Sequence, residues 1–233
     1  MRIPLYVELN GKKIVVIGGG GVGTSRAKKF LSYGAKVVVI SLDFSDELKR
    51  LEKERKVELV YGDAKRADFL EKYVKDAFMV VVAVGSREVN EVVEKLSKKY
   101  NFLKNFANDA ERTEVVVPFE GEVEGIKIAV TTEGKSGIVA RIVRDKILEM
   151  IKSDRETINL LRAMHFFKRY MKDEEIPVDI RMKMYFAISS DEKFLELVKS
   201  GRIEDAKTYA VNFLREYLSG ERDLDESKTR IQF

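Results

Sequence analysis

Apolar residues in the first half of the chain form short β-branched runs separated by amphipathic stretches. Continuous runs of this kind are typical of strands in a parallel sheet whose two faces are both covered. The stretches between them have the spacing of helices with one exposed face. This alternation predicts an α/β fold with a Rossmann-type, doubly wound parallel sheet. We expect strands over residues 5–9, 13–17, 36–41, 57–61, 78–83 and 102–106, and helices over residues 24–33, 44–55, 68–74 and 88–100.

The pattern changes after Asn108. Residues 115–119 and 126–132 have strand character and no helix separates them. We therefore expect a hairpin or an extended pair outside the parallel sheet, bridged by residues 120–125. A helix should start near Gly137, with Ser136 as its N-cap. Its apolar face would hold Ile138, Ile142, Ile147 and Met150.

Strand patterns are missing after Ser153, where apolar stripes at helical spacing predict a helical region. Pro177 should break it after the first helix, and the last helix should stop near Gly220. The charged tail over residues 221–230 is expected to fray. The stripes are Leu160, Leu161, Met164, Phe167 and Met171, then Phe194, Leu197 and Val198, then Ala206, Tyr209, Ala210, Phe213, Leu214 and Tyr217.

A glycine-rich turn follows the second predicted strand and opens a helix. Gly18, Gly20 and Gly23 fit the pattern G-x-G-x-x-G, in which the first glycine makes the turn, the second admits a pyrophosphate and the third lets the helix pack closely. A strand-to-helix turn without a ligand is the alternative, but four consecutive glycines cost backbone entropy that such a turn rarely needs. We therefore expect a dinucleotide site.

The end of the next strand should hold the adenosine ribose, about 20 residues past the glycines. Ser41 or Asp43 occupies this position rather than a clean terminal aspartate. Asp43 could serve the ribose or cap the following helix. No arginine follows the strand to hold a 2′-phosphate, which favours NAD over NADP.

Composition narrows the function classes. The 233 residues carry a net charge of +4 from 43 basic and 39 acidic side chains, which are interspersed rather than clustered. A nucleic-acid surface needs clustered basic residues, so we expect no nucleic-acid partner. No apolar run reaches the length of a membrane span and no signal-peptide pattern is present, so we expect a soluble, cytoplasmic protein. The chain has no cysteine and one histidine, His165, so a protein metal site is not expected.

Four segments in order resemble the precorrin-2 dehydrogenase family, the dehydrogenase part of sirohaem synthases, over about residues 1–150. Two of them, the opening residues 3–13 and the glycine turn at residues 18–23, are shared by many Rossmann proteins. The third is Asn105-Phe106-Ala107-Asn108-Asp109 followed by Val117-Pro118, and the fourth and most specific runs from Ile128 through Thr131-Thr132-Glu133-Gly134-Lys135-Ser136-Gly137 to Ala140-Arg141-Ile142-Val143-Arg144.

The resemblance implies NAD-dependent oxidation of precorrin-2 to sirohydrochlorin by a homodimer, and some family members also insert ferrous iron. It implies an NAD-binding Rossmann domain over residues 1–112, a dimerisation and substrate segment over residues 113–152, and a helical C-terminal domain over residues 153–233. Family contacts to NAD fall on Gly21, Val22, Leu42 and Asp43. Ser136 falls where some members carry a serine near the tetrapyrrole pocket that can be phosphorylated.

This sequence departs from the family at the proposed catalytic aspartate, whose place is taken by Asn108, with Asp109 one residue later. Either the loop shifts so that Asp109 takes the proton while Asn108 orients the substrate, or this protein works without a carboxylate at that point. The alternative without a catalytic role is that the pair is turn chemistry between strand and helix. Gly137 stands where the family often has proline. Gly85-Ser86 stands where a threonine and acidic residues are commoner.

The substrate is rich in carboxylates, so its pocket should offer basic side chains and a helix N-terminus. Lys135, Ser136, Arg141 and Arg144, with Asn105, are the predicted substrate-binding residues, although a solvated helix face is the alternative for the basic ones. His165 is expected to pack or lie at the surface, with a role as base or iron ligand as the lesser possibility. Two rival functions stay open: a sirohydrochlorin ferrochelatase with a vestigial NAD site, and a non-catalytic NAD-sensing module.

Overall fold

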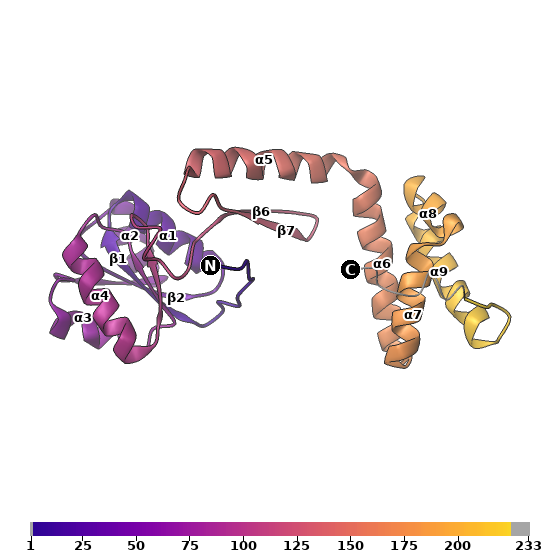
Figure 1. Ribbon diagram of the computed structural model, residues 1–233, viewed down its shortest axis with the longest axis horizontal. Helices are drawn as coiled ribbons and strands as arrows, with labels where there is room; N and C mark the ends of the chain where they lie inside the picture. Colours follow the sequence, from indigo (N-terminus) through magenta and orange to yellow (C-terminus); the bar gives the residue numbers. More distant parts are fainter. Residues whose placement is uncertain (1, 225–233) are drawn as a thin grey trace. The chain divides into compact units, whose positions relative to one another are not determined.

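The computed structural model describes residues 2–224 and divides into two compact units (Figure 1). The first comprises Met1–Phe119 and Thr131–Ala140, and the second comprises Glu120–Val130 and Arg141–Phe233. The assignment of separate functions to residues 1–112, 113–152 and 153–233 stays a prediction.

A five-stranded parallel sheet forms the centre of the first unit and confirms the predicted fold class. Its strands occur in the order β3-β2-β1-β4-β5, so β1 lies between β2 and β4. Ile17 of β1 stands opposite Ile40 of β2 and Val82 of β4. The strands are β1 (Lys13–Gly19), β2 (Lys36–Phe44), β3 (Val57–Tyr61), β4 (Met79–Val82) and β5 (Leu103–Phe106).

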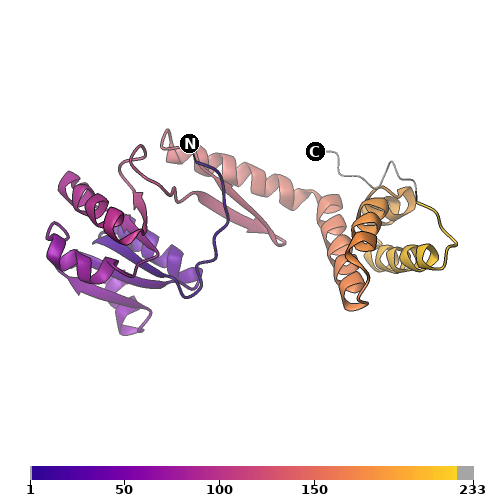
Figure 2. The ribbon, with the colours of Figure 1, turned by 60° about the horizontal axis from the view of Figure 1, so that its bottom comes forward.

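Helices cover both faces of this sheet (Figures 1 and 2). Successive strand residues point to opposite faces, so Ile14 and Val16 pack with α1 and α2, whereas Val15 and Ile17 pack with α3 and α4. All four side chains are at most 2% exposed, which explains why these strands read as continuous apolar runs. The helices are α1 (Gly21–Ser32), α2 (Asp46–Lys53), α3 (Ala67–Val74) and α4 (Arg87–Tyr100).

Two predictions within the first 100 residues are wrong. Residues 5–9 form no strand, because no neighbouring strand pairs with them, and Leu5 and Tyr6 are 72% and 68% exposed. The helix predicted from Phe44 begins at Asp46, because Phe44 continues β2 and the Ser45 hydroxyl caps the helix by accepting the Leu48 N–H.

The predicted pair after Asn108 is a two-stranded hairpin, but its first strand is shifted. The hairpin joins β6 (Phe119–Val123) to β7 (Ile126–Val130) through Glu124 and Gly125, both at positive φ. Residues 115–118 are not a strand. Pro118 has no N–H to donate to a ladder, and Val115 instead donates its N–H to the Lys104 carbonyl at 3.2 Å.

Helix α5 (Gly137–Ser153) starts where the sequence predicts it, with the Ser136 hydroxyl accepting the Val139 N–H at 3.3 Å. Its predicted apolar face is poorly covered: Ile138 is 68% exposed and Met150 is 64% exposed. Only Ala140 of this helix is buried.

The remainder of the second unit is helical, as predicted. Buried Phe167, Phe194 and Phe213 belong to one apolar core that draws on all four helices. Helix α7, which follows Pro177, was not among the predicted elements. Among the described residues, no helix has the length and apolar character needed to cross a bilayer. Residues 225–230 of the predicted charged tail lie outside the described part. The helices are α6 (Arg155–Asp173), α7 (Val178–Ser189), α8 (Glu192–Lys199) and α9 (Ile203–Leu218).

Candidate functional site

The glycine turn lies at the carboxyl end of β1, where chain connections leave the sheet in opposite directions toward β2 and β4. Ligands of doubly wound sheets bind at this kind of switch point. Gly18 has φ +116°, and a methyl group there would lie 2.9 Å from the Ala83 carbonyl oxygen. A methyl group on Gly23 would overlap the Gly18 carbonyl oxygen. Both glycines are therefore required by the close packing of β1, β4 and α1.

Gly20 and Gly21 differ from these two, because a methyl group placed on either would meet no described atom within 4 Å apart from its chain neighbours and the adjacent helix backbone. Gly20 is the N-cap of α1, and no described side chain caps this helix. The first turn also carries no acidic residue. The result is open space in front of backbone N–H groups at the positive end of a helix, which suits a pyrophosphate.

The end of β2 lies beside this turn. The Ser41 hydroxyl accepts the Gly19 N–H at 3.0 Å, so Ser41 fixes the glycine turn. Leu42 is 74% exposed. The Asp43 carboxylate is also exposed, accepts the Phe44 N–H at 2.8 Å and lies 3.9 Å from Lys49. Since Ser45 caps α2, the capping alternative for Asp43 is wrong, and a contact from Asp43 to a ribose stays a prediction.

A hydrogen bond that the sequence did not reveal ties the helices on either side of this turn. Thr24 of α1 and Ser45, the cap of α2, lie 2.8 Å apart through their hydroxyl oxygens. Thr24 is 5% exposed. Two hydroxyl residues at helix starts are a frequent pattern, so nothing in the sequence singled out this pair.

Asn105, a predicted substrate residue, is buried in β5 at 4% exposure. Its Nδ2 donates to the Val115 carbonyl at 2.7 Å, and its Oδ1 has no partner among the described residues. Thr113 completes the cluster, because its hydroxyl accepts the Phe106 N–H at 2.7 Å. This geometry favours a structural role for Asn105, which fastens the segment after β5 to the sheet.

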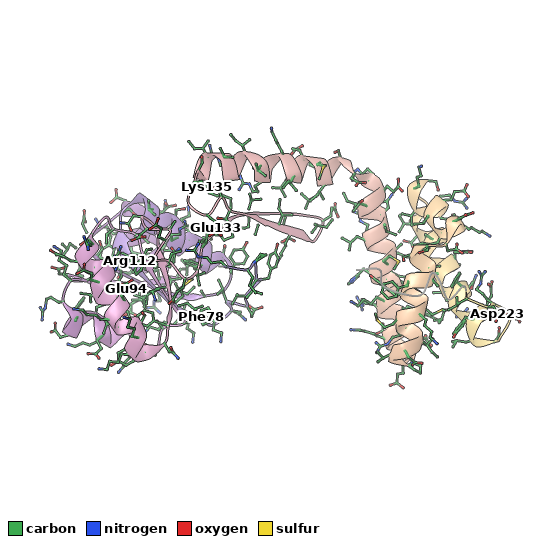
Figure 3. The ribbon with its side chains drawn as sticks, viewed as in Figure 1. Phe78, Glu94, Arg112, Glu133, Lys135 and Asp223 are labelled. Atoms are coloured by element: carbon green, nitrogen blue, oxygen red, sulfur yellow. The ribbon has the colours of Figure 1, made fainter. Side chains whose placement is uncertain are left out.

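Asn108 and Asp109 follow β5 at its carboxyl end but differ in environment. Asn108 is exposed, whereas Asp109 is partly buried and accepts the Arg112 N–H at 3.1 Å through Oδ1. The Arg112 guanidinium donates two hydrogen bonds to the Glu94 carboxylate of α4, from Nε to Oε1 at 3.0 Å and from Nη2 to Oε2 at 2.5 Å (Figure 3). These hydrogen bonds hold the pKa of the Glu94 carboxyl below its ordinary value. Asp109 is therefore a turn residue in this conformation, and Asn108 is the side chain presented at the surface.

The predicted substrate residues near α5 fall in both units. Lys135 is exposed in the turn before α5 (Figure 3). Ser136 caps the helix. Arg141 is exposed on the helix. Arg144 is partly buried, pairs with Asp145 and donates to the Glu120 carbonyl at 3.3 Å. Of the four, Lys135 and Ser136 belong to the unit that carries the glycine turn.

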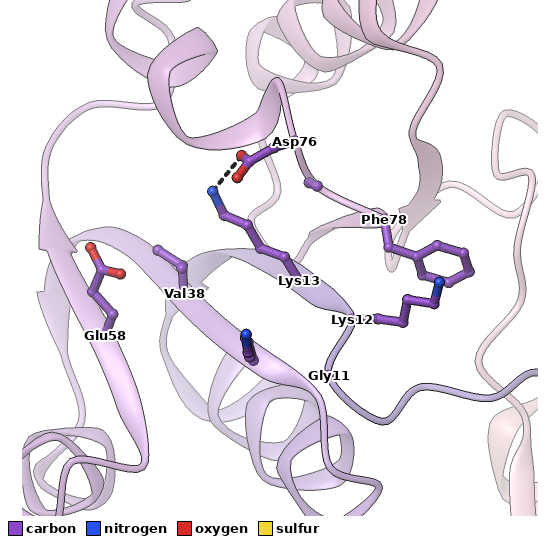
Figure 4. Close-up of a pocket in the computed structure, with 9 residues that line it drawn as sticks. Gly11, Lys12, Lys13, Val38, Glu58, Asp76 and Phe78 are labelled. Carbon is purple, nitrogen blue, oxygen red and sulfur yellow. Dashed lines mark hydrogen bonds and ion pairs between the residues drawn. The ribbon is translucent and has the colours of Figure 1, made fainter.

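A cavity opens at the opposite edge of the sheet, against the amino-terminal ends of β1 and β2 (Figure 4). Lys13 lines it and lies 2.5 Å from Asp76, which lowers the pKa of that carboxyl. Lys12 stands over the Phe78 ring at 5.5 Å. Dinucleotides bind at carboxyl ends of parallel strands, so this cavity is not the cofactor site.

The described residues contain no group of three or more histidine, cysteine or acidic side chains that could hold a metal ion. His165 is exposed on α6, in agreement with a surface position.

Comparison with known proteins supports the dinucleotide site predicted at the glycine turn. Residues 5–119 match a family model described as "Putative NAD(P)-binding". The "Putative precorrin-2 dehydrogenase" of Methanocaldococcus jannaschii is 28% identical over 200 residues, which cover 84% of this chain and 94% of that protein. The precorrin-2 dehydrogenase of Bacillus subtilis is 26% identical over 65% of this chain and 90% of its own length.

Longer relatives match over only part of their length. The siroheme synthase of Photorhabdus laumondii is 23% identical, and the match covers 88% of this chain but 42% of that enzyme. Among solved structures, "SirC, precorrin-2 dehydrogenase" superposes with a TM-score of 0.66 at 20% identity, covering 89% of this chain and all of that one. At this identity the superposition establishes a shared fold, including the helical unit.

Proposed function

We propose that this chain belongs to the precorrin-2 dehydrogenase family and oxidises precorrin-2 to sirohydrochlorin with NAD as the hydride acceptor. The observation that carries the proposal is the open, uncapped amino terminus of α1 at the switch point, in a chain that matches precorrin-2 dehydrogenases over nearly their whole length. The helix terminus provides the dinucleotide site, and the identity of the substrate is inferred from the similarity to precorrin-2 dehydrogenases.

The pyrophosphate would lie against the N–H groups at Gly20, Gly21 and Val22. Open space at the first two allows the close approach that two negative charges require. The adenosine ribose would lie at the end of β2, where the exposed Asp43 carboxylate can accept its hydroxyl hydrogens. The same charge repels a 2′-phosphate, which is why NAD is preferred over NADP.

The reaction removes two electrons and two protons from precorrin-2. NAD, when bound, takes one hydrogen with both electrons as hydride, and the second hydrogen leaves as a proton. Asn108 is placed at the carboxyl end of β5, where its amide can donate to a substrate carboxylate and orient the ring. Asparagine cannot take the proton. We propose that the proton leaves through a carboxylate of the substrate to water, while Asp109 holds the loop.

Basic side chains would bind the carboxylates at the rim of the tetrapyrrole. Lys135 and the Ser136 end of α5 are exposed or partly exposed and carry the positive charge and the helix N-terminus that such a ligand needs. Arg141 adds an exposed guanidinium on the same helix. Arg144, which pairs with Asp145, would have to exchange this partner for the substrate.

A cytoplasmic homodimer is part of the proposal. The α5 residues Ile138, Ile142 and Met150 are 68%, 46% and 64% exposed, and apolar side chains grouped on one helix face mark interaction surfaces. A second copy of the chain would cover this face. NADH must be reoxidised by other dehydrogenases, which places the protein in the compartment that holds the NAD pool. Sedimentation of the purified chain at twice the monomer mass, reduced to monomer by Ile142→Glu, would support the dimer.

The testing experiment supplies precorrin-2 and NAD to the purified chain under anaerobic conditions and follows the absorbance of sirohydrochlorin. A rise that needs NAD supports the dehydrogenase. Sirohydrochlorin and ferrous iron, given without NAD, test the ferrochelatase alternative in the same instrument. NAD binding without turnover of either substrate would instead favour the sensing module and contradict the proposal.

A further inference from the structure

Arg2 contacts two segments that lie far from it in the sequence. Its guanidinium donates to the carbonyl oxygens of Ala110 and Thr113, and it pairs with the Glu133 carboxylate. The Nε and Nη2 atoms lie 3.2 and 2.8 Å from the Thr113 oxygen. Arg2 precedes the opening residues quoted for the family resemblance, and nothing in the sequence marks it.

The two segments that Arg2 joins carry candidate site residues. Ala110 and Thr113 belong to the loop after β5, directly after Asn108 and Asp109. Glu133 belongs to the turn that precedes α5 and carries Lys135 and Ser136. All of these residues lie in the first compact unit.

The turn before α5 is held in one conformation. Glu133 has φ +53°, a left-handed conformation that costs an ordinary residue about 1 kcal/mol or more. Thr132 stabilises the turn, because its hydroxyl accepts the Ser136 N–H at 2.9 Å and donates to the Ser136 carbonyl at 3.0 Å. The pairing with Arg2 orients the Glu133 side chain of this strained residue toward the loop.

A second contact joins the same two segments independently of Arg2. A methyl group on Gly134 would lie 2.5 Å from the Cβ atom of Ala110, so the backbone of the turn packs directly on the loop. The loop is itself fixed to α4 by the fork between Arg112 and Glu94. Arg2 therefore bridges two rigid segments at the place where they meet.

We propose that Arg2 is a positioning residue, which holds the Asn108 loop and the Lys135–Ser136 turn in the relative arrangement that binds the tetrapyrrole. This inference rests on the proposed function. Arginine suits the task because one planar fork reaches two carbonyl oxygens and a carboxylate together. Arg2 contacts neither the cofactor nor the substrate. Because the segments that it holds carry the proposed substrate-binding residues, loss of Arg2 should weaken precorrin-2 binding and leave NAD binding unchanged.

The test compares Arg2→Met with Arg2→Lys, and uses Arg87→Met as the matched control. Arg87 pairs with Glu91 on the exposed face of α4, with its side chain 86% exposed. For Arg2→Met we expect kcat/KM for precorrin-2 to fall about 10- to 100-fold, since small misplacements of binding groups have effects of this size. The Kd for NAD should change less than about twofold, because the glycine turn is unaffected. Arg2→Lys should recover part of the loss, because lysine restores the pair with Glu133 but not the fork.

Amide hydrogen exchange gives a readout that does not depend on turnover. In Arg2→Met, the amides of Arg112, Lys135 and Ser136 should exchange faster, while those of β1 and β4 stay unchanged. Precorrin-2 kinetics and exchange equal to those of Arg87→Met would overturn the positioning role. An inactive wild-type chain would refute the proposed function instead, and the two failures are therefore distinguishable.

Discussion

The guanidinium of Arg112 forks onto the carboxylate of Glu94, with Nε 3.0 Å from Oε1 and Nη2 2.5 Å from Oε2. The pair fastens the loop after β5, which carries Asn108, to the amphipathic helix α4. Both side chains are about one-third exposed, at 32% and 31%. The loop that presents the candidate site is thus fixed to a helix of the core and is not a free connection.

This pair predicts a pH dependence of stability. Because the folded-state pKa of Glu94 is lowered by the hydrogen bond from Arg112, its contribution is present above the unfolded-state value of about 4.3. It is lost as the pH falls through the lower folded-state pKa. Glu94→Gln should lower the free energy of unfolding by about 1 kcal/mol at pH 7, and the difference from wild type should vanish in acid.

Urea unfolding at a series of pH values measures this difference. Glu91→Gln is the matched control, because Glu91 pairs with the exposed Arg87 on the same helix. We expect a change below about 0.5 kcal/mol for the control. A Glu94→Gln difference that is the same at pH 7 and in acid would contradict the role given to the pair.

Two alanine substitutions in the glycine turn should affect different properties, one the affinity for NAD and the other the stability of the fold. Gly20 has φ −79° and open space around it, so Gly20→Ala should leave the melting temperature unchanged and weaken NAD binding at least about tenfold by blocking the pyrophosphate. Gly23→Ala should destabilise the fold by about 1–3 kcal/mol, because the new methyl group meets the Gly18 carbonyl oxygen. Thermal unfolding and NAD titration by calorimetry separate the two effects. Unchanged NAD affinity in Gly20→Ala would remove the pyrophosphate from this turn.

Asn105 and Asn108 should also behave differently. Asn105→Ala removes a buried donor to the partly buried Val115 carbonyl and should cost about 1–3 kcal/mol of stability. Asn108→Ala, at an exposed position, should change stability by less than about 0.5 kcal/mol but lower kcat/KM for precorrin-2. Chemical denaturation and steady-state kinetics of both variants measure these quantities. Normal turnover by Asn108→Ala would exclude the substrate contact proposed for it.

Asp43 should determine the choice between NAD and NADP. Asp43→Asn should weaken NAD binding about tenfold, the effect of losing a charged hydrogen-bond acceptor, and should narrow the preference over NADP. Asp46→Asn is the matched control, since both carboxylates lie 3.9 Å from Lys49 but Asp46 belongs to the first turn of α2. Equal Kd ratios for the two dinucleotides in both variants would show that Asp43 does not face the ribose.

The sequence predicts those features that depend on local patterns. The central strands β1 and β4 are buried on both faces. The turn at Gly23 follows from a strand that runs into a helix. Both features could therefore be predicted from neighbouring residues. The strand predicted at residues 5–9 has the same local character but lacks a partner strand, and pairing is not a local property.

The site is less predictable because its side chains are positioned by distant partners. Asp109 has the residue type of a proton acceptor, but one of its carboxylate oxygens accepts the Arg112 N–H within the turn, a partner that spacing alone does not reveal. Asn105 matches a family motif, yet its buried amide donates to the Val115 carbonyl of the segment after β5. The contact between Arg2 and Glu133 spans most of the Rossmann unit in sequence, and no spacing rule links such residues.

Anaerobic turnover of a limiting amount of precorrin-2 tests the central claim most directly, with NADH and sirohydrochlorin measured in the same sample. Direct hydride transfer predicts equal molar amounts of the two products, formed at the same rate by the wild-type chain and at a strongly reduced rate by Gly20→Ala. Sirohydrochlorin formed without an equal amount of NADH, or no NAD-dependent product at all, would contradict the assignment of this protein as an NAD-dependent dehydrogenase of precorrin-2.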